Sequence, residues 1–476
     1  MIRGLSRIHI FRGIRHDQKY FPLYPLVSKK KVSHMRRIVW AFTVVCLTVL
    51  AASSAHAVVV ERVRSPGGIE AWLIEDHATP ILTMNFLFRG GAALDPAGRT
   101  GLATMVAALV TEGAGEWDSG DFQTNLERLS IRLGFTADHD TFNGSLQTLT
   151  KNRETAFALL KLALTAPRFD ADAVERVRVQ IQAAIAESAE NPDTVAAETW
   201  CAKMFPGHPY GRSAYGTPED LAVITQADLK EFVARRLGRD AVIIGVAGDI
   251  APAPLAILLD QAFGTLPART QPFSIPAASP KASGQVTVVK KDIPQSVAVF
   301  GHGGIAMTDP DWYAASLVNH ILGGHPISSR LGNEVRENRG LSYSVGSTLS
   351  FYDQAALIQG SVATQNSRFN DSLAIIRAEW RKMAEHGPIA TELADAKTYL
   401  TGSWPLALDG TDQMADILVD MQRYDWGLEY LDKRNDHLER VTLADARRVA
   451  ARLLNPDALE VVIVGRPDEP TPPQER

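Results

Sequence analysis

The sequence predicts an α+β fold of two duplicated domains, each a mostly antiparallel sheet covered by helices on one face. Three observations support this prediction. Long segments recur in the second half of the chain, each half alternates short strand patterns with long helical ones, and a proline-rich stretch separates the halves. The chain has 476 residues, of which 45% are hydrophobic and 22% charged, so it can bury more than one core.

The duplication is clearest near the end of each half. Residues 224–250, ITQADLKEFVARRLGRDAVIIGVAGDI, match residues 441–467, VTLADARRVAARLLNPDALEVVIVGRP, at an offset of 217. Both segments predict a Thr-capped amphipathic helix, a short turn and a buried strand that ends in glycine. The starts of the halves correspond as well, because residues 82–96 resemble residues 296–310 at an offset of 213.

Helical and strand patterns fill the first half. Residues 153–165 and 172–190 predict helices, and residues 132–149 predict a pair of antiparallel strands. Residues 101–115, GLATMVAALVTEGAG, predict a helix with two stripes. The core-facing stripe consists of Leu102, Met105, Val106, Leu109 and Val110. The second stripe has small side chains, at Thr104, Ala107, Ala108 and Thr111. On its own, the second stripe indicates only close packing against another element.

These patterns set the domain boundaries. Residues 58–266 form the first domain, 267–284 the linker and 285–467 the second domain, followed by a tail over 468–476. The linker, PARTQPFSIPAASPKASG, has four prolines and no apolar periodicity. We therefore expect it to be extended and to act as a hinge between the halves.

Residues 1–57 are typical of a leader rather than of a folded domain. Met35-Arg36-Arg37, the apolar run IVWAFTVVCLTVLAA and the A-x-A sequence ending at Ala57 indicate a secretory signal peptide, with Met35 as the true start. We expect cleavage between Ala57 and Val58 and a periplasmic or secreted protein. The run is too short to predict stable membrane insertion, and a chain tethered by an uncleaved signal is the alternative.

Charge and cysteine content exclude some classes of protein. Without residues 1–57 the chain has 39 basic and 53 acidic side chains, a formal net charge of −14, which argues against a nucleic-acid partner. Cys46 lies in the signal peptide and leaves Cys201 alone, so no internal disulfide is expected. No Ser/His/Asp or Cys/His arrangement indicates a hydrolase that works by itself.

Three further stretches resemble one family. They are RGGAALDPAGRTGLATMVAALVTEGAG (89–115), FPGHPYG (205–211) and SRLGNEVRENRGLSYSV (329–345). With the duplication, they make residues 58–466 similar to the pitrilysin/insulysin (inverzincin) metallopeptidases, and among them to the two-domain branch that includes the mitochondrial processing peptidase. The resemblance implies that the chain is one half of a two-chain clamshell.

The family's zinc site has no ligands in this sequence. Catalytic members carry His-x-x-Glu-His on the helix after the Gly-Gly loop, and a further Glu ligand on a later helix. The matching positions here are Thr104, Ala107 and Ala108, with Ala184 at the place of the later Glu. The resemblance therefore implies a vacated zinc site and no cofactor in this chain, with the zinc in a partner subunit. His208, and the pair His320 and His325, are interpreted as local hydrogen-bonding residues rather than ligands.

A second motif of the family is present. In the family, an Arg and a Tyr seven residues apart reach the active site of the facing half and hydrogen-bond the substrate backbone. Arg336 and Tyr343 match in type and spacing. A guanidinium is a permanent, multiple donor and a phenol can donate to an oxyanion, which suits this role. From the residues alone, Arg336 could equally be a solvated helix residue and Tyr343 a core tyrosine.

Loss of the zinc ligands and presence of the Arg/Tyr pair together predict a function. We expect the non-zinc, substrate-orienting subunit of a periplasmic zinc metalloendopeptidase that acts on peptides or unfolded proteins, inactive without a homologous zinc-bearing partner. The alternative is a catalytically inert peptide-binding or scaffold protein of the same fold.

Overall fold

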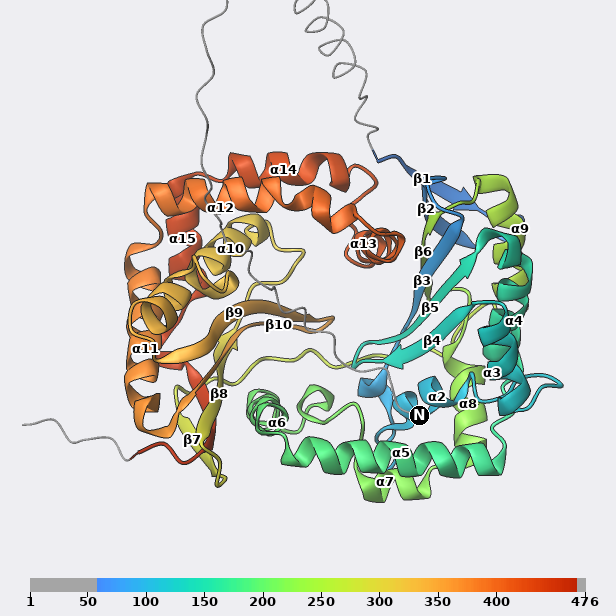
Figure 1. The fold of residues 1–476 in the computed structure, drawn as a ribbon, viewed down its shortest axis with the longest axis horizontal. Helices are drawn as coiled ribbons and strands as arrows, with labels where there is room; N and C mark the ends of the chain where they lie inside the picture. The colour runs from blue at the N-terminus through green and yellow to red at the C-terminus, as the bar shows by residue number, and fades with distance from the viewer. Residues whose placement is uncertain (1–57, 469–476) are drawn as a thin grey trace, which may run out of the picture. The chain divides into compact units, whose positions relative to one another are not determined.

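Two β-sheets organise residues 58–468, the part of the chain that the computed structural model describes (Figure 1). The first sheet has six strands in the order β1-β2-β6-β3-β5-β4, and the second has five in the order β7-β11-β8-β10-β9. All neighbours are antiparallel except β2 with β6 and β7 with β11. The parallel pair thus recurs at the same place in both sheets, as a duplication requires.

The elements of the first half are bounded as follows. Its strands are β1 (Val60–Arg64), β2 (Glu70–Glu75), β3 (Ile81–Arg89), β4 (Arg132–Ala137), β5 (Thr141–Leu149) and β6 (Val242–Gly248). Its helices are α2 (Leu102–Leu109), α3 (Ser119–Arg128), α4 (Arg153–Thr165), α5 (Ala171–Glu190), α6 (Pro192–Met204), α7 (Pro218–Val223), α8 (Gln226–Arg236) and α9 (Pro252–Phe263).

The second half repeats this plan with fewer helices, and no helix follows its last strand among the described residues. Its strands are β7 (Val286–Lys290), β8 (Gln295–Gly303), β9 (Ser342–Tyr352), β10 (Ala355–Gln365) and β11 (Glu460–Gly465). Its helices are α10 (Trp312–Asn319), α11 (Phe369–His386), α12 (Ala390–Gly402), α13 (Thr411–Arg423), α14 (Tyr430–Arg440) and α15 (Leu443–Leu453). Residues 267–284, between α9 and β7, contain neither helix nor strand.

The predicted α+β class is confirmed, and local sequence signals explain many element boundaries. The helices α8 and α15 each begin with a capping box, in which Thr225 pairs with Asp228 and Thr442 with Asp445. The helix predicted over 101–115 is shorter than expected. It ends at Leu109, because the chain then turns through glycines with positive φ, at 103° for Gly113 and 62° for Gly115.

The two halves are joined by packing as well as by the linker. Helix α13 of the second half packs on β2, β3 and β6 of the first, and α6 of the first half packs on β8 and β11 of the second. Trp200 of α6 is fully buried, and its indole N–H donates to the Glu460 carbonyl oxygen at 3.1 Å. These contacts oppose free movement of the two halves about the linker, in contrast to the expected hinge.

Two predicted segments at the ends of the chain fall outside the described residues. The predicted signal peptide, residues 1–57, and the residues after Asp468 lie outside the described part of the chain. Within residues 58–468, no helix is long and apolar enough to cross a membrane.

Candidate functional site

The helix that matches the family's zinc helix is held by a buried carboxylate. Asp95 accepts hydrogen bonds from the backbone N–H groups of Gly101 and Ala103, at 2.9 and 3.1 Å, and so caps the first turn of α2. Burial raises the pKa of Asp95 to about 7, while the N–H donors and the nearby Arg212 oppose this shift. No capping pattern in the sequence indicates Asp95, because it lies six residues before Gly101, the N-cap position of α2.

The four vacated positions have no metal-binding chemistry in the structure. The Thr104 hydroxyl donates to the Ala214 carbonyl oxygen at 2.6 Å, and Ala107 is buried in the core of the first half. Ala108 and Ala184 are exposed, the latter on α5, which packs against α2. Among the described residues, no group of three or more His, Cys, Asp or Glu could hold a metal ion. A zinc ion therefore does not fit this set of residues.

Arg336 and Tyr343 lie side by side. The guanidinium carbon of Arg336 is 5.5 Å from the centre of the Tyr343 ring, a cation–π distance. The Arg336 side chain is partly exposed and its Nε lies 3.4 Å from Glu337 Oε1. Tyr343 is 86% exposed, which rules out a core tyrosine at this position. The predicted pair is thus brought together at the surface.

Irregular backbone at each of the two residues positions the Arg336 and Tyr343 side chains. Arg336 lies in a π-helical segment, Gly332–Glu337, which packs beside β9. Gly340 then turns the chain with a φ of 56°. Tyr343 is the extra residue of a β-bulge, since Ser342 pairs with Thr364 and Ser344 with Ala363. A bulge re-aims a side chain relative to the regular alternation of the strand, which explains why Tyr343 does not follow Val345 into the core.

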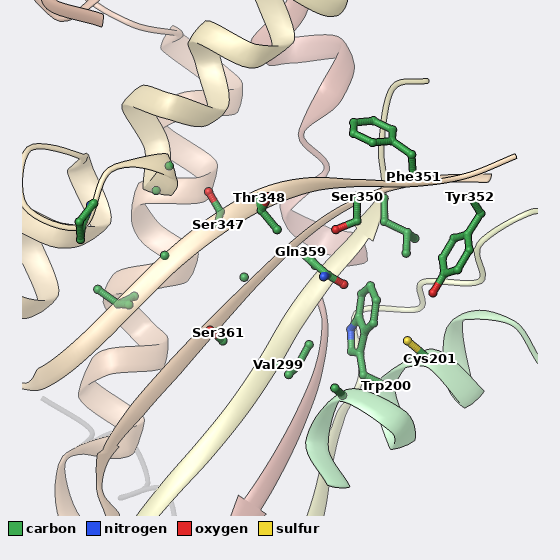
Figure 2. A pocket seen from close by; sticks show the side chains of 18 residues that line it. Trp200, Cys201, Val299, Ser347, Thr348, Ser350, Phe351, Tyr352, Gln359 and Ser361 are labelled. Atoms are coloured by element: carbon green, nitrogen blue, oxygen red, sulfur yellow. The ribbon is translucent and has the colours of Figure 1, made fainter. Parts of the chain in front are cut away.

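A cavity of about 570 Å³ lies along the same strand (Figure 2). Its sheet wall is uncharged and combines polar side chains, Thr348 and Ser350 from β9 and Gln359 and Ser361 from β10, with apolar ones, Val299, Val345 and Leu357. Trp200 and Cys201 of α6 form part of the opposite wall. Neither Arg336 nor Tyr343 lines this cavity. Of the β9 residues that do, Val345 is nearest to Tyr343 along the strand. The cavity has hydroxyl and amide groups suited to a peptide backbone, but no acid–base pair.

Among the described residues, each sheet has two edge strands, β1 and β4 in the first and β7 and β9 in the second. Of these, β4 packs beside α2, and β9 carries Tyr343. The edge of β9 is partly covered, because the side chain of Asn319 donates to the Ser347 carbonyl oxygen at 3.3 Å. The exposed edge beside the former zinc helix is therefore that of β4.

The other histidines and the cysteine have structural surroundings. His208 accepts from the Tyr210 backbone N–H at 3.1 Å, as expected for a bracing residue, and His325 accepts from the Ser328 N–H at 3.1 Å. His320 stacks on Tyr399, with ring centres 5.0 Å apart. Cys201 is half-buried, and burial raises the pKa of its thiol, which disfavours a nucleophilic thiolate.

One polar network was missed by the sequence analysis. The buried Tyr210, in the FPGHPYG stretch, donates to Asp140 Oδ1 at 2.6 Å. The other oxygen of Asp140 accepts from the backbone N–H of Asp353 at 2.9 Å, at the tip of the β9–β10 hairpin, and Arg423 of α13 pairs with Asp353 at 2.9 Å. This network fixes the second half to the first, and nothing local in the sequence indicates such long-range partners.

Comparison with known proteins agrees with the motifs. Residues 71–218 match the family model "Insulinase (Peptidase family M16)", and residues 224–400 match the model "Peptidase M16 inactive domain". The chain belongs to the M16 peptidase family. This confirms the predicted pitrilysin/insulysin relationship.

Three relatives show what kinds of M16 protein the chain is similar to. It is 28% identical over 333 residues to the non-peptidase homolog YmxG of Helicobacter pylori, covering 70% of this chain and 77% of that protein. It is 24% identical over 415 residues to the mitochondrial-processing peptidase subunit beta of Blastocladiella emersonii, covering 84% and 88%. A crystal structure of a peptidase M16 inactive domain from Pseudomonas fluorescens superimposes with a TM-score of 0.81 at 27% identity, covering 87% of this chain and 100% of that one.

Proposed function

We propose that this chain is the non-zinc, substrate-orienting subunit of a two-chain, periplasmic zinc metalloendopeptidase that acts on peptides or unfolded proteins. One observation carries the proposal: Arg336 and Tyr343 are paired and solvent-accessible in a chain whose zinc positions hold no ligands. In such a complex a homologous partner subunit holds the zinc and the general base.

The chemistry of the pair suits this role. The Arg336 guanidinium can donate to a carbonyl oxygen of the peptide backbone and hold it in place. The Tyr343 hydroxyl can donate to the oxygen that gains charge when the scissile carbonyl is attacked. Tyr343 is 86% exposed and lies on a bulge at the start of the edge strand β9. It can therefore reach a group supplied by a facing subunit.

The proposed partner follows from what this chain lacks. A catalytic zinc site needs three protein ligands and an open position, and Thr104, Ala107, Ala108 and Ala184 supply none. Similarity to a subunit of the mitochondrial-processing peptidase supports assembly with a second, homologous chain. The signal peptide proposed for residues 1–57 would place this chain in the periplasm, so the proposed partner must be secreted as well.

The deciding experiment uses the reconstituted complex with a zinc-bearing homologue that carries His-x-x-Glu-His. We expect Arg336→Ala or Tyr343→Phe to lower turnover about 10- to 1000-fold, equivalent to roughly 1.4–4 kcal/mol of transition-state stabilisation. Complex mass and the zinc content of the partner should not change, because neither residue is proposed to hold the interface or the metal.

Two controls match the variants. Tyr399→Phe removes a hydroxyl from another accessible tyrosine of the second half, 49% exposed. Arg339→Ala removes a neighbouring guanidinium that pairs with Glu334. Both should leave turnover within about 2-fold of the parent, as expected for surface substitutions away from the chemistry. Full activity of the Arg336 and Tyr343 variants, or a loss explained entirely by failed assembly, would refute the proposed role.

A second candidate function is a catalytically inert peptide-binding or scaffold protein. The unpaired edge of β4 beside α2 favours it, since a peptide can add to such an edge as an extra strand without any zinc. Similarity to a non-peptidase homolog also supports it. This function predicts peptide binding by the isolated chain that is unaffected by Arg336→Ala.

A further inference from the structure

The duplication makes the two halves comparable strand by strand. In the first sheet, Glu75 of β2 lies opposite Gly248 of β6, and in the second, Lys290 of β7 lies opposite Gly465 of β11. The same register therefore makes β2 and β7 equivalent. Helix α4 follows β5 as α11 follows β10, each after a single 3-10 turn.

In the first half, a helix covers this part of the sheet. Helix α9 directly follows β6 and packs against α4 and β1 (Figure 1). Its inner face consists of buried apolar side chains at helical spacing, Leu255, Leu258, Leu259, Ala262 and Phe263. Ala71 and Leu73 of β2 belong to the same buried cluster and are 0% exposed.

In the second half the equivalent surface is open. Val286 and Val288 of β7 stand at the register positions of Ala71 and Leu73, yet they are 44% and 43% exposed. No helix follows β11 among the described residues. A groove of about 810 Å³ lies there instead, between β7 and α11, with Leu373, Ala374 and Ile463 also on its walls.

The rim of this groove is positively charged. Lys290, Arg377 and Arg466 line it, together with one carboxylate, Asp468. Arg466 is also 3.4 Å from Asp292, an exposed pair that salt and solvent weaken. The groove therefore combines an apolar floor with an excess of cationic groups, which complements an acidic, amphipathic partner.

We propose that this groove, defined by β7, α11 and residues 463–468, is a docking site for an amphipathic α-helix with acidic flanks from a partner protein. The chain itself indicates this occupant, because α9, a helix with an apolar face at i, i+3, i+4, i+7 and i+8, packs at the equivalent edge in the first half. The basic residues 1–34 have the wrong charge for this rim. This site does not depend on the proposed peptidase role, since neither Arg336 nor Tyr343 lines it.

A synthetic helix tests the proposal directly. The probe is a fluorescein-labelled peptide of residues 251–266, with Ala253→Glu, Ile257→Glu and Gln261→Glu on the outward face of α9. A matched peptide carries Lys at those three positions. Fluorescence anisotropy should show saturable binding of the acidic peptide to the purified protein and weaker binding of the basic one.

Substitutions locate the binding. Ala374→Glu, at an exposed position of α11, and Val288→Asp should each weaken binding at least 10-fold, and Arg377→Glu should reverse the preference for the acidic peptide. Val179→Asp on α5 is the control, since Val179 is 54% exposed and lies outside the groove. Circular dichroism melts test whether the variants are folded. If Val288→Asp does not fold, Ala374→Glu still tests the groove.

Three outcomes would overturn the proposal. The first is no saturation up to about 100 µM peptide, a concentration that corresponds to a binding free energy near −5.5 kcal/mol. The second is binding that appears only after deletion of residues 469–476, which would show that the chain covers its own groove. The third is a change of oligomeric state on Val288→Asp in sedimentation, which would make a second copy the occupant.

Discussion

The tight contact between Gly245 of the first half and α13 of the second gives a sharp test of whether the halves act as one rigid unit. Helix α13 lies so near β6 that a Cβ atom at Gly245 would be 2.3 Å from the Ala415 carbonyl oxygen and 2.9 Å from Leu418 Cβ. Atoms essentially never come that close without a shift of the backbone. Gly245→Ala must therefore push α13 away from the first sheet by about 1 Å.

The expected cost follows from the kind of contact. Overpacking a buried site costs about 1–3 kcal/mol, and here the upper end applies because backbone stands on both sides. At roughly 2 °C per kcal/mol for a large chain, the melting temperature should fall by about 6 °C. Calorimetry and urea unfolding followed by tryptophan fluorescence measure both quantities. We expect the lost contact to separate the unfolding transitions of the two halves as well.

Gly134→Ala is the matched control. Gly134 lies in the edge strand β4, and a Cβ there would meet only Ser145 Oγ, at 3.6 Å, an ordinary contact. This variant should be neutral or slightly stabilising, because alanine loses less backbone entropy on folding than glycine. If Gly245→Ala is as stable as Gly134→Ala within about 0.5 kcal/mol, the docking of α13 described above is incorrect.

Three further predictions concern pH, metal and processing. Asp95 binds its proton more tightly when folded, with a pKa of about 7 against 3.8, so its contribution to folding stability should fall by up to roughly 4 kcal/mol as pH rises from 4 to 7. Asp95→Asn should remove that pH dependence from unfolding curves. Elemental analysis of the isolated chain should find no stoichiometric zinc, and about one tightly held zinc per chain would contradict this prediction. A variant with Thr104→His, Ala107→Glu and Ala108→His should bind zinc poorly unless it also carries Ala184→Glu. Mass spectrometry of the native protein should find an N-terminus near Val58, whereas a membrane-bound chain that retains residues 1–57 would favour the tethered form.

Local signals in the sequence were sufficient for much of the fold. Capping boxes at Thr225 and Thr442 place two helix starts, and the periodicity over 153–165 gives α4 its observed bounds. The helix predicted over 101–115 ends early at Leu109, because residues 110–112 form a turn that leads into Gly113 and Gly115, which have positive φ. Periodicity reports which residues are apolar, and it does not report where positive φ angles end a helix.

The site was predictable in its residue types and not in its geometry. The seven-residue spacing indicates Arg336 and Tyr343, but regular alternation along the strand would bury Tyr343 with Val345. The bulge that exposes it arises from the pairing of Ser342 with Thr364, far along the chain. The docking of α13 and the Tyr210–Asp140 bond are long-range in the same sense, so a single sequence carries no signal for them.

The vacated zinc positions and the Arg336/Tyr343 pair have different surroundings in this fold. The zinc positions have become part of the packing: Thr104 satisfies the Ala214 carbonyl and Ala107 is buried in the core, so a carboxylate at 107 would be desolvated at a cost of several kcal/mol. Arg336 and Tyr343 contribute little to any core, because they contact each other, the side chain of Glu337 and solvent. Their replacement should change folding stability by less than about 0.5 kcal/mol. A loss of turnover in Tyr343→Phe, with unchanged melting temperature and complex mass, then has no structural explanation and must reflect the missing hydroxyl.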